Sequence, residues 1–325
     1  MNESKKKEPK IVLSTIFLLD YLRKYGVLIA LVIICIVLTI LSPNFLTVQN
    51  ILIVLRQISI NGILAIGVTF VILAGGIDLS LGSVVALTGV VAALFAQDAS
   101  YTVTVALSMG ILSGLGIGAI NGLIITKGNT VPFVVTLGMM TVARGLALVI
   151  SDGRPISNLS ESFNFIGGGN LLGLPLPILI FTIVIILSIL ILNHTKIGRY
   201  IYAVGGNENA AKASGINIHL VKTFTYIVCS GLAGLAGIIL ASRITTGQPN
   251  AGIAYELDAI AAVVIGGTSL SGGIGKITGT VIGALIIGVI NNGLDLLNVS
   301  SYYQQIIKGI IIISAILIDR KNSQH

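Results

Sequence analysis

Two glycine-rich segments hold the residues whose types and spacing are best suited to chemistry. The first, AGGIDLSLGS, places Asp78 two residues before Ser80, and the second, IGGTSLSGG, places Ser269 two residues before Ser271. Paired glycine-interrupted segments of this kind indicate an internal repeat with broken helices beside a transport path. Their polar side chains either contact a solute, form a gate or make a structural turn, and the sequence leaves these readings open. The matched residues are Gly75 with Gly266, Gly76 with Gly267, Asp78 with Ser269, and Ser80 with Ser271.

One arginine lies deep within an apolar run. Arg144 occurs in TVARGLALVI, where a charge is costly in a bilayer and is usually paired or faces an aqueous cavity. Asp78 and Asp152 are acids that could pair with it. We expect Arg144 to be paired in this way, and we also keep it as a candidate for the translocation path or gate. Lys308, in the last apolar run, is expected to extend its ammonium group toward the membrane surface.

Signatures of catalysis and of nucleotide binding are missing. The segment SGGIGK resembles a phosphate-binding loop, but Leu270 and Ile277 occupy positions where that motif requires a glycine and a hydroxyl residue. The chain has neither HExxH nor GxSxG, its three histidines lie on separate polar segments, and its two cysteines lie in apolar runs. We expect no catalytic site, no metal site and no cofactor held by this chain.

The composition is that of an all-α integral membrane protein. Of the 325 residues, 54% are hydrophobic and 10% are charged, whereas soluble domains carry about 25% charged residues. The net charge of +7 comes without aromatic residues interleaved among the basic ones, so we expect no nucleic-acid partner. Ten membrane spans are predicted, at residues 25–41, 47–73, 81–96, 103–125, 131–150, 177–192, 221–241, 257–270, 277–297 and 302–318.

The lysines and arginines orient this domain, 25–318, in the membrane. With an N-terminal tail, 1–24, in the cytoplasm, most basic residues fall on the cytoplasmic side, and Arg154 and Arg243 fall outside. An even number of spans returns the C-terminal tail, 319–325, to the cytoplasm. The second span contains polar residues and is expected to be oblique or broken.

Stripes of glycine at four-residue spacing occur within the predicted spans. They cover residues 110–122 and 275–283. Small residues at this spacing let helix backbones approach closely. Helix packing is therefore preferred here over a path for a sugar along the glycines.

The longest polar interruption on the predicted cytoplasmic side is 193–222. Asn207 is a good N-cap and Gly215 lies where a C-cap is expected, so a short helix, 208–214, is predicted. Its small side chains would suit a groove in another protein. An ordinary polar loop with one helical turn is the alternative, and composition does not separate the two. The residues assigned to this contact are Gly205, Gly206, Asn207, Glu208, Ala210, Ala211, Ser214 and Gly215.

A polar segment on the opposite side, RITTGQPNAGIAYELD, ends with two acids. A loop that meets a soluble partner has this composition, and so does any solvated loop. The residues assigned to a docking surface are Arg243, Gln248, Asn250 and Glu256.

The chain resembles the permease subunit of ribose-type ABC sugar importers. The resemblance rests on AGGIDLSLGSVVALTGVVAA, on VPFVVTLGMMTVARGLALVISDGRPIS, on KIGRYIYAVGGNENAAKASGI, and on GQPNAGIAYELDAIAAVVIGGTSLSGGIGKITGT. These motifs occur in the family's order, and the similarity covers residues 44–321.

The resemblance implies a homodimeric permease of the type II importer architecture in the bacterial inner membrane, with about ten helices per chain. An ATPase subunit with two nucleotide-binding cassettes would bind ATP and Mg, and an extracytoplasmic binding protein would deliver a monosaccharide, most simply ribose. In that family the loop matching 205–215 holds the coupling helix that docks in the ATPase. The resemblance also supports cavity-lining roles near Asp78 and Ser80.

Two other classes remain as alternatives. A secondary transporter also shows repeats and broken helices, but it would be expected to hold ionisable residues in the membrane for ion coupling. Arg144 is the only ionisable residue that the sequence places clearly in the middle of a predicted span. A membrane enzyme is disfavoured by the missing catalytic sets.

Overall fold

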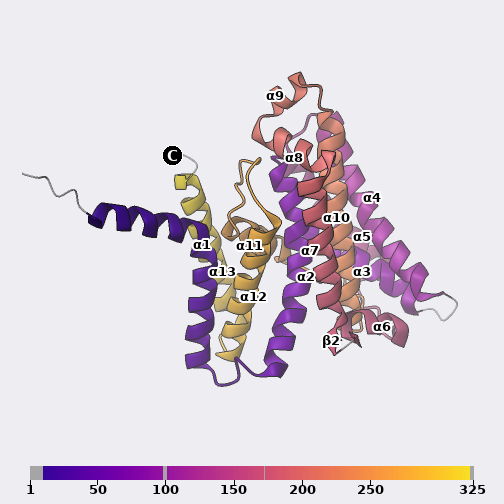
Figure 1. Ribbon diagram of the computed structural model, residues 1–325. Coiled ribbons are helices and arrows are strands. Elements are labelled where there is room, and N and C mark those ends of the chain that lie inside the picture. The colour runs from indigo at the N-terminus through magenta and orange to yellow at the C-terminus, as the bar shows by residue number, and fades with distance from the viewer. Residues whose placement is uncertain (1–9, 98–100, 172, 323–325) are drawn as a thin grey trace, which may run out of the picture.

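The computed structural model describes residues 10–97, 101–171 and 173–322, which are mainly helical (Figure 1). The helices are α1 (Lys10–Leu41), α2 (Val48–Leu73), α3 (Leu81–Gln97), α4 (Val103–Lys127), α5 (Pro132–Ile150), α6 (Glu161–Gly168), α7 (Leu176–His194), α8 (Lys196–Gly206), α9 (Glu208–Ala213), α10 (Ile218–Arg243), α11 (Tyr255–Ile265), α12 (Ile277–Leu296) and α13 (Ser301–Asn322). Two short strands, β1 (Asn170–Leu171) and β2 (Leu174–Pro175), pair antiparallel.

Six helices of the described chain are long and apolar enough to cross a membrane: α2, α4, α5, α7, α10 and α12. Helix α3 and the part Gly26–Leu41 of α1 are apolar but shorter. Each of the ten predicted spans overlaps a helix. The predicted span 257–270 was too long, however, because α11 ends before Gly266 and has 11 residues. Such a helix rises about 16 Å, whereas the hydrocarbon core is about 30 Å thick.

Two further elements differ from the prediction. Helix α2 is one continuous helix of 26 residues, so the second span is not broken. The polar segment 193–222 also contains α8, which was not predicted, although Ile201 and Val204 are buried at the spacing of one helical face. Helix α1 begins within the predicted tail 1–24, and residues 1–9 and 323–325 lie outside the described residues.

Helix α10 is the centre of the packing, in contact with α2, α3 and α4. The glycine stripe of α4 lies against it. A Cβ at Gly118 would lie 2.8 Å from the Cα of Ile227, and one at Gly122 would lie 2.7 Å from the Cα of Thr223. These distances leave no room for a side chain, so the prediction that the stripe serves close helix packing is confirmed.

Helix α2 separates two groups of helices (Figure 1). Helices α3, α4, α5, α7 and α10 lie on one side of it, and α1, α11, α12 and α13 lie on the other. Both α11 and α12 contact α2 directly, while α13 contacts α11 and α1 contacts α12. The two helix breaks, between α2 and α3 and between α11 and α12, are therefore brought to the same central helix.

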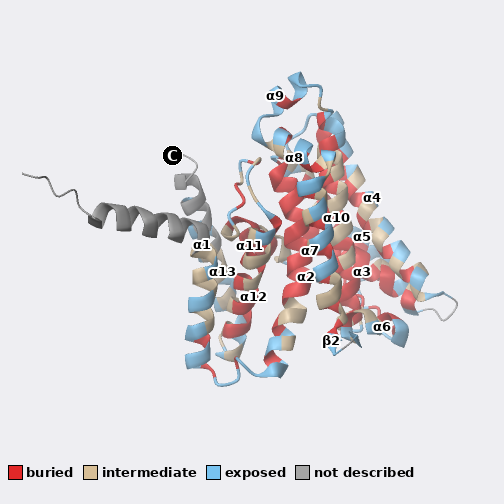
Figure 2. Ribbon diagram, viewed as in Figure 1, coloured by how far each residue is buried: buried red, intermediate tan, exposed pale blue. Residues whose placement is uncertain are grey.

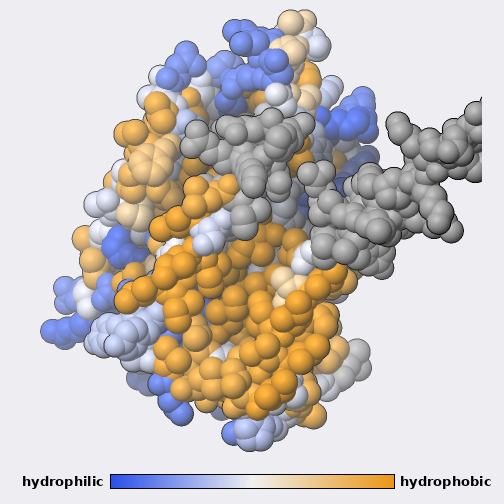
Figure 3. Space-filling view, turned by 90° about the vertical axis from the view of Figure 1, so that its left-hand side faces the viewer, coloured by the Kyte–Doolittle hydropathy of each residue, from blue (hydrophilic) through white to orange (hydrophobic). Residues whose placement is uncertain are grey.

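The outer surface is apolar where a bilayer would cover it. The buried residues concentrate in the central helices, and α1 carries many exposed residues along its described face (Figure 2). Ile40 of α1 is 79% exposed and Leu317 of α13 is 63% exposed. The face shown in Figure 3 has a broad hydrophobic area with hydrophilic patches toward both ends. Such a surface fits a multi-pass membrane protein, since lipid tails are the solvent that it matches.

Candidate functional sites at the α9 end and at two helix breaks

Helix α9 is a single capped turn that projects from one end of the bundle (Figure 1). The Asn207 side chain accepts a hydrogen bond from the Ala210 amide at 2.9 Å, as predicted for an N-cap. At the other end, the Gly215 amide donates to the Lys212 carbonyl and the Ile216 amide donates to the Ala211 carbonyl. These two bonds are the Schellman pattern, which satisfies carbonyls at a helix end. The predicted helix 208–214 is confirmed, with Ser214 as the C-cap.

The side chains of α9 do not all face outward. Ala211 is 4% exposed and belongs to the hydrophobic core of the chain. The neighbouring Glu208, Ala210, Lys212 and Ser214 are exposed. The Ala211 methyl group thus packs within its own chain in this structure, and its contact with a partner stays a prediction.

The two glycines before α9 also differ in their surroundings. Gly206 is exposed, and a Cβ there would meet no atom within 4 Å. Gly205 is packed against the Leu73 carbonyl at the end of α2 and against the Gly273 amide. One turn earlier, the Tyr202 hydroxyl donates to the Gly275 carbonyl at 3.0 Å. Burial raises the pKa of Tyr202, so its hydroxyl stays protonated as a donor.

A cavity of about 610 Å³ opens beside α9. It lies between the segment that follows α9 and the loop that joins α4 to α5, and we call it the α9 cavity. Its walls include Asn129 and Thr130 of that loop and Lys212 and His219 from the α9 side. The Lys222 ammonium lies 2.6 Å from the Glu208 carboxylate on its rim. The site is thus an open polar cavity next to an exposed helical turn.

The first helix break follows α2. Gly75 adopts a φ of +76°, a left-handed conformation that a residue with a Cβ rarely takes. Asp78 is then fully buried, and its Oδ1 accepts from the Ser80 amide at 2.9 Å and from the Ser80 hydroxyl at 2.6 Å. The Asn121 amide donates to the Ser80 hydroxyl at 3.1 Å. Asp78 and Ser80 therefore close a turn inside the core.

The second break repeats this turn after α11. Gly267 has a φ of +84°, and the Ser269 hydroxyl accepts from the Ser271 amide at 3.3 Å. Asp78 and Ser269, which were predicted to match, thus each accept a hydrogen bond from the amide two residues later. The glycine match is shifted by one residue, because Gly267 and not Gly266 takes the conformation of Gly75. The second break has one residue fewer between the helix end and the turn.

Arg144 has different partners from those predicted. Its Nη1 donates to the carbonyls of Pro249 at 2.6 Å and Ala251 at 2.8 Å. Neither Asp78 nor Asp152 pairs with it among the described contacts. Two carbonyl oxygens of a loop distant in sequence bind the guanidinium, and no local pattern could have indicated them.

Arg144 lines an open groove of about 450 Å³ on the side of the bundle. Ser83 of α3, Thr141 of α5 and Glu256 of α11 line the same groove, which we call the Arg144 groove. The remaining wall is mostly apolar, with residues such as Met140 and Leu148. Charged and hydroxyl groups gather here at the start of α11, a helix too short to cross a membrane alone.

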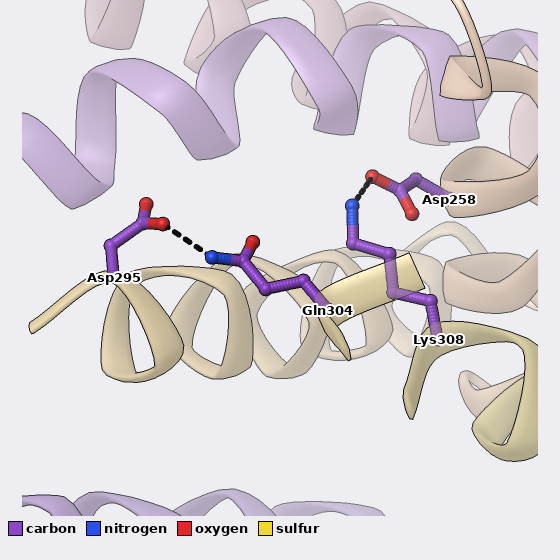
Figure 4. Close-up of polar contacts among 4 residues, drawn as sticks. All are labelled: Asp258, Asp295, Gln304 and Lys308. Carbon is purple, nitrogen blue, oxygen red and sulfur yellow. Dashed lines mark hydrogen bonds and ion pairs between the residues drawn. The ribbon is translucent and has the colours of Figure 1, made fainter. Parts of the chain in front are cut away.

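The structure shows an ion pair that sequence reasoning missed. Lys308 Nζ of α13 lies 2.9 Å from Asp258 Oδ2 of α11, and the two side chains are 25% and 6% exposed (Figure 4). The expectation that Lys308 extends to the membrane surface is therefore wrong. Nearby, Gln304 of α13 donates to Asp295 of α12 at 2.8 Å. The sequence could have indicated this pair, because Asp258 and Lys308 are opposite charges in two separate predicted spans.

The predicted docking residues differ in exposure. Asn250 is exposed, while Gln248 is half-buried. Arg243 is half-buried at the end of α10, beside Tyr255. Glu256 lies in the Arg144 groove and not on the outer loop. Asn250 is thus the most exposed of the four, and the docking role of the set stays a prediction.

Comparison with known proteins identifies the class to which this arrangement belongs. Residues 50–316 match the family model described as branched-chain amino acid transport system permease component. The match covers most of the chain, which therefore belongs to this family of transport permeases.

Several relatives are similar over nearly their whole length. The ribose import permease protein RbsC of Escherichia coli (strain K12) is 48% identical, over 93% of this chain and 95% of the relative. The protein of the same name from Bacillus subtilis (strain 168) is 50% identical, over 93% and 94%. The D-allose transport system permease protein AlsC of Escherichia coli (strain K12) is 40% identical, over 91% of each. No solved structure matches the chain.

Proposed function

We propose that this chain is the permease subunit of an ATP-driven importer that moves ribose across the bacterial inner membrane. Support comes from the 48% and 50% identity to two ribose import permeases, against 40% to a permease for D-allose. The structural observation that carries the proposal is α9, an exposed and doubly capped turn at the end of a membrane bundle. A helix so short gains little stability alone, which suits a contact element held between two proteins.

In this proposal α9 is the coupling helix that docks in an ATPase subunit. The exposed Glu208, Ala210 and Lys212 would face the ATPase, and Ala211 would hold the helix on the permease. The α9 cavity beside it would receive a side chain of the partner. ATP and Mg would be bound by the two nucleotide-binding cassettes of that subunit, with no cofactor held by this chain.

A second copy of the chain would cover the Arg144 groove. Arginine and glutamate side chains are too costly to leave facing lipid, so a wall that carries Arg144 and Glu256 calls for a protein or an aqueous space opposite it. A homodimer supplies both. The sugar would then pass between the two copies, where the hydroxyl oxygens of Ser83 and Thr141 could accept hydrogen bonds from its hydroxyls.

The membrane orientation follows from the same reading. The α9 end would face the cytoplasm together with both termini, and ten crossings would be completed by α11 with the non-helical segment that leads into it. The opposite end, with α6 and the exposed Asn250, would receive an extracytoplasmic sugar-binding protein. Asp78, Ser80, Ser269 and Ser271 would act as the turns that fix the gate instead of as contacts to the sugar.

The test is assembly and transport in proteoliposomes that contain the permease, its ATPase and the binding protein. Ala210→Asp places an unpaired charge in the docking contact, which costs about one to several kcal/mol. Because about 1.4 kcal/mol is a tenfold change in affinity, ATPase binding should fall tenfold or more. Ser300→Asp, an exposed change at the opposite end, is the matched control and should leave binding unchanged. Wild-type ATPase affinity in the Ala210→Asp variant would exclude α9 as the contact.

A secondary transporter is the second candidate, and the Asp258–Lys308 ion pair favours it, because ionisable groups within a membrane domain are used for ion coupling. Ribose uptake driven by an ion gradient in liposomes without ATPase would support this candidate. Uptake that requires ATP inside the liposome would support the importer.

A further inference from the structure

The end of α8 and the two helix breaks meet at one backbone junction. The Gly273 amide of the second break donates to the carbonyl of Leu73, the last residue of α2, at 3.0 Å. The second break is thus hydrogen-bonded directly to the helix that leads into the first break. This bond joins the two halves of the repeat through main-chain atoms, whose positions no rotamer change can adjust.

Gly205 of α8 lies inside this junction. A Cβ at Gly205 would collide with the Leu73 carbonyl oxygen and would lie 2.6 Å from the Gly273 nitrogen. From the side of the second break, a Cβ at Gly272 would lie 2.9 Å from the Gly205 carbonyl oxygen and 3.0 Å from the Cα of Gly75. All of these neighbours are backbone atoms. The end of α8 therefore touches both breaks at the closest approach that the backbone allows.

A second contact ties α8 to the second break. Tyr202 lies three residues before Gly205, on the same helical face, and its hydroxyl donates to the Gly275 carbonyl. Because this bond and the glycine contacts lie one turn apart, they fix the direction of α8 relative to the loop between α11 and α12. A single contact would leave the helix free to pivot.

The route from α9 to these breaks is short. Asn207 alone separates α8 from α9, and its side chain caps α9. The other tie of α9 to the bundle includes the Lys222–Glu208 pair, whose side chains are 18% and 53% exposed. Exposed ion pairs contribute only about 0 to 1 kcal/mol. The buried Ala211 also holds α9 to the bundle, but it does not lie at the breaks. A displacement of α9 would thus reach the two breaks through the end of α8.

We propose that Gly205 is a positioning residue for transport, which places the end of α8 against both helix breaks so that movement of α9 shifts the two breaks together. This inference rests on the proposed function for the source of the movement. The absence of a side chain at Gly205 is what permits the contact. Tyr202 keeps α8 in the matching orientation.

The test compares two glycines in the complete complex. Gly205→Ala should keep ATP hydrolysis within about twofold of wild type while ribose imported per ATP falls tenfold or more. Gly116→Ala in α4, where a Cβ meets no atom within 4 Å, should change neither quantity. Tyr202→Phe removes one hydrogen bond without adding volume and should lower import per ATP about threefold. If Gly205→Ala fails to assemble, the comparison of Tyr202→Phe with Gly116→Ala decides.

A purely structural role predicts a different result, in which hydrolysis and import fall in proportion and their ratio stays at the wild-type value. That ratio would overturn the inference. A readout independent of transport is amide hydrogen exchange in the permease alone, where Gly205→Ala should speed exchange at 74–80 and 267–276 and Gly116→Ala should not. Faster exchange confined to α8 would also overturn it. Failure of wild-type permease to bind an ATPase, with the exchange pattern as expected, would refute the proposed function and leave the junction standing.

Discussion

The ion pair between α11 and α13 is open to a double-mutant cycle. Asp258→Asn and Lys308→Gln each remove one charge while keeping a polar side chain of similar size. At 2.9 Å the attraction is about 6 kcal/mol for an effective dielectric constant of about 20, before the cost of desolvating both groups is subtracted. Both side chains are less than one-third exposed, so screening by water removes little of it.

Each single variant leaves a charge without its partner. Removing one member of a buried pair costs about 3 to 5 kcal/mol, because the remaining charge stays in a poor solvent. The double variant has neither charge, so no unpaired charge is left buried. We therefore expect it to be more stable than the sum of the single effects predicts, with a coupling energy of about 1 to 3 kcal/mol.

The assay is the free energy of unfolding in mixed detergent micelles, measured for wild type, the two single variants and the double variant. Asp295→Asn is the control, since Asp295 is exposed and an amide can still accept from Gln304. Its effect should be about 0.5 kcal/mol or less. Strict additivity of the Asp258 and Lys308 variants would refute the reasoning, because it would mean that the two charges do not interact in the folded protein.

Two further measurements follow from the packing and from the turns. Gly118→Ala should destabilise the protein by about 1 to 3 kcal/mol because its Cβ would overlap the backbone at Ile227, whereas Gly116→Ala, with no atom within 4 Å, should not. Equal free energies of unfolding for the two variants, measured by the same assay, would contradict the packing of α4 on α10. Amide hydrogen exchange should be slower at Ser80 than at Ser271, because the Ser80 amide is buried with a 2.9 Å hydrogen bond, whereas Ser271 is exposed with a 3.3 Å hydrogen bond. The reverse order would show that the second turn is the more stable one.

Local features were predictable from the sequence because their determinants are local. The caps of α9 depend on Asn207 and on Gly215 within a few residues of the helix, and both were found where propensity placed them. The matched turns at Asp78 and Ser269 depend on a side chain and the amide two residues later. Such contacts leave a signature in neighbouring residues.

Features that depend on distant segments were not predictable. Arg144 binds carbonyls more than 100 residues away, and carbonyls carry no sequence signal. Lys308 reaches Asp258 across 50 residues. Ala211 was expected to face a partner, but which side of α9 is covered is decided by α8 and α10, not by its own composition. The end of α11 was misplaced because the apolar pattern continues beyond the glycines that stop the helix.

The two breaks share a turn but not its strength, and this difference bears on how they would move. At the first break, the Asp78 carboxyl group accepts two hydrogen bonds, at 2.9 and 2.6 Å, in a fully buried position. At the second, the neutral Ser269 hydroxyl accepts one longer bond from the exposed Ser271. If the end of α8 pushes on both, the second turn should yield first while the first holds its shape. Two matched turns of unequal strength would thus give an order of opening, which two identical turns could not provide.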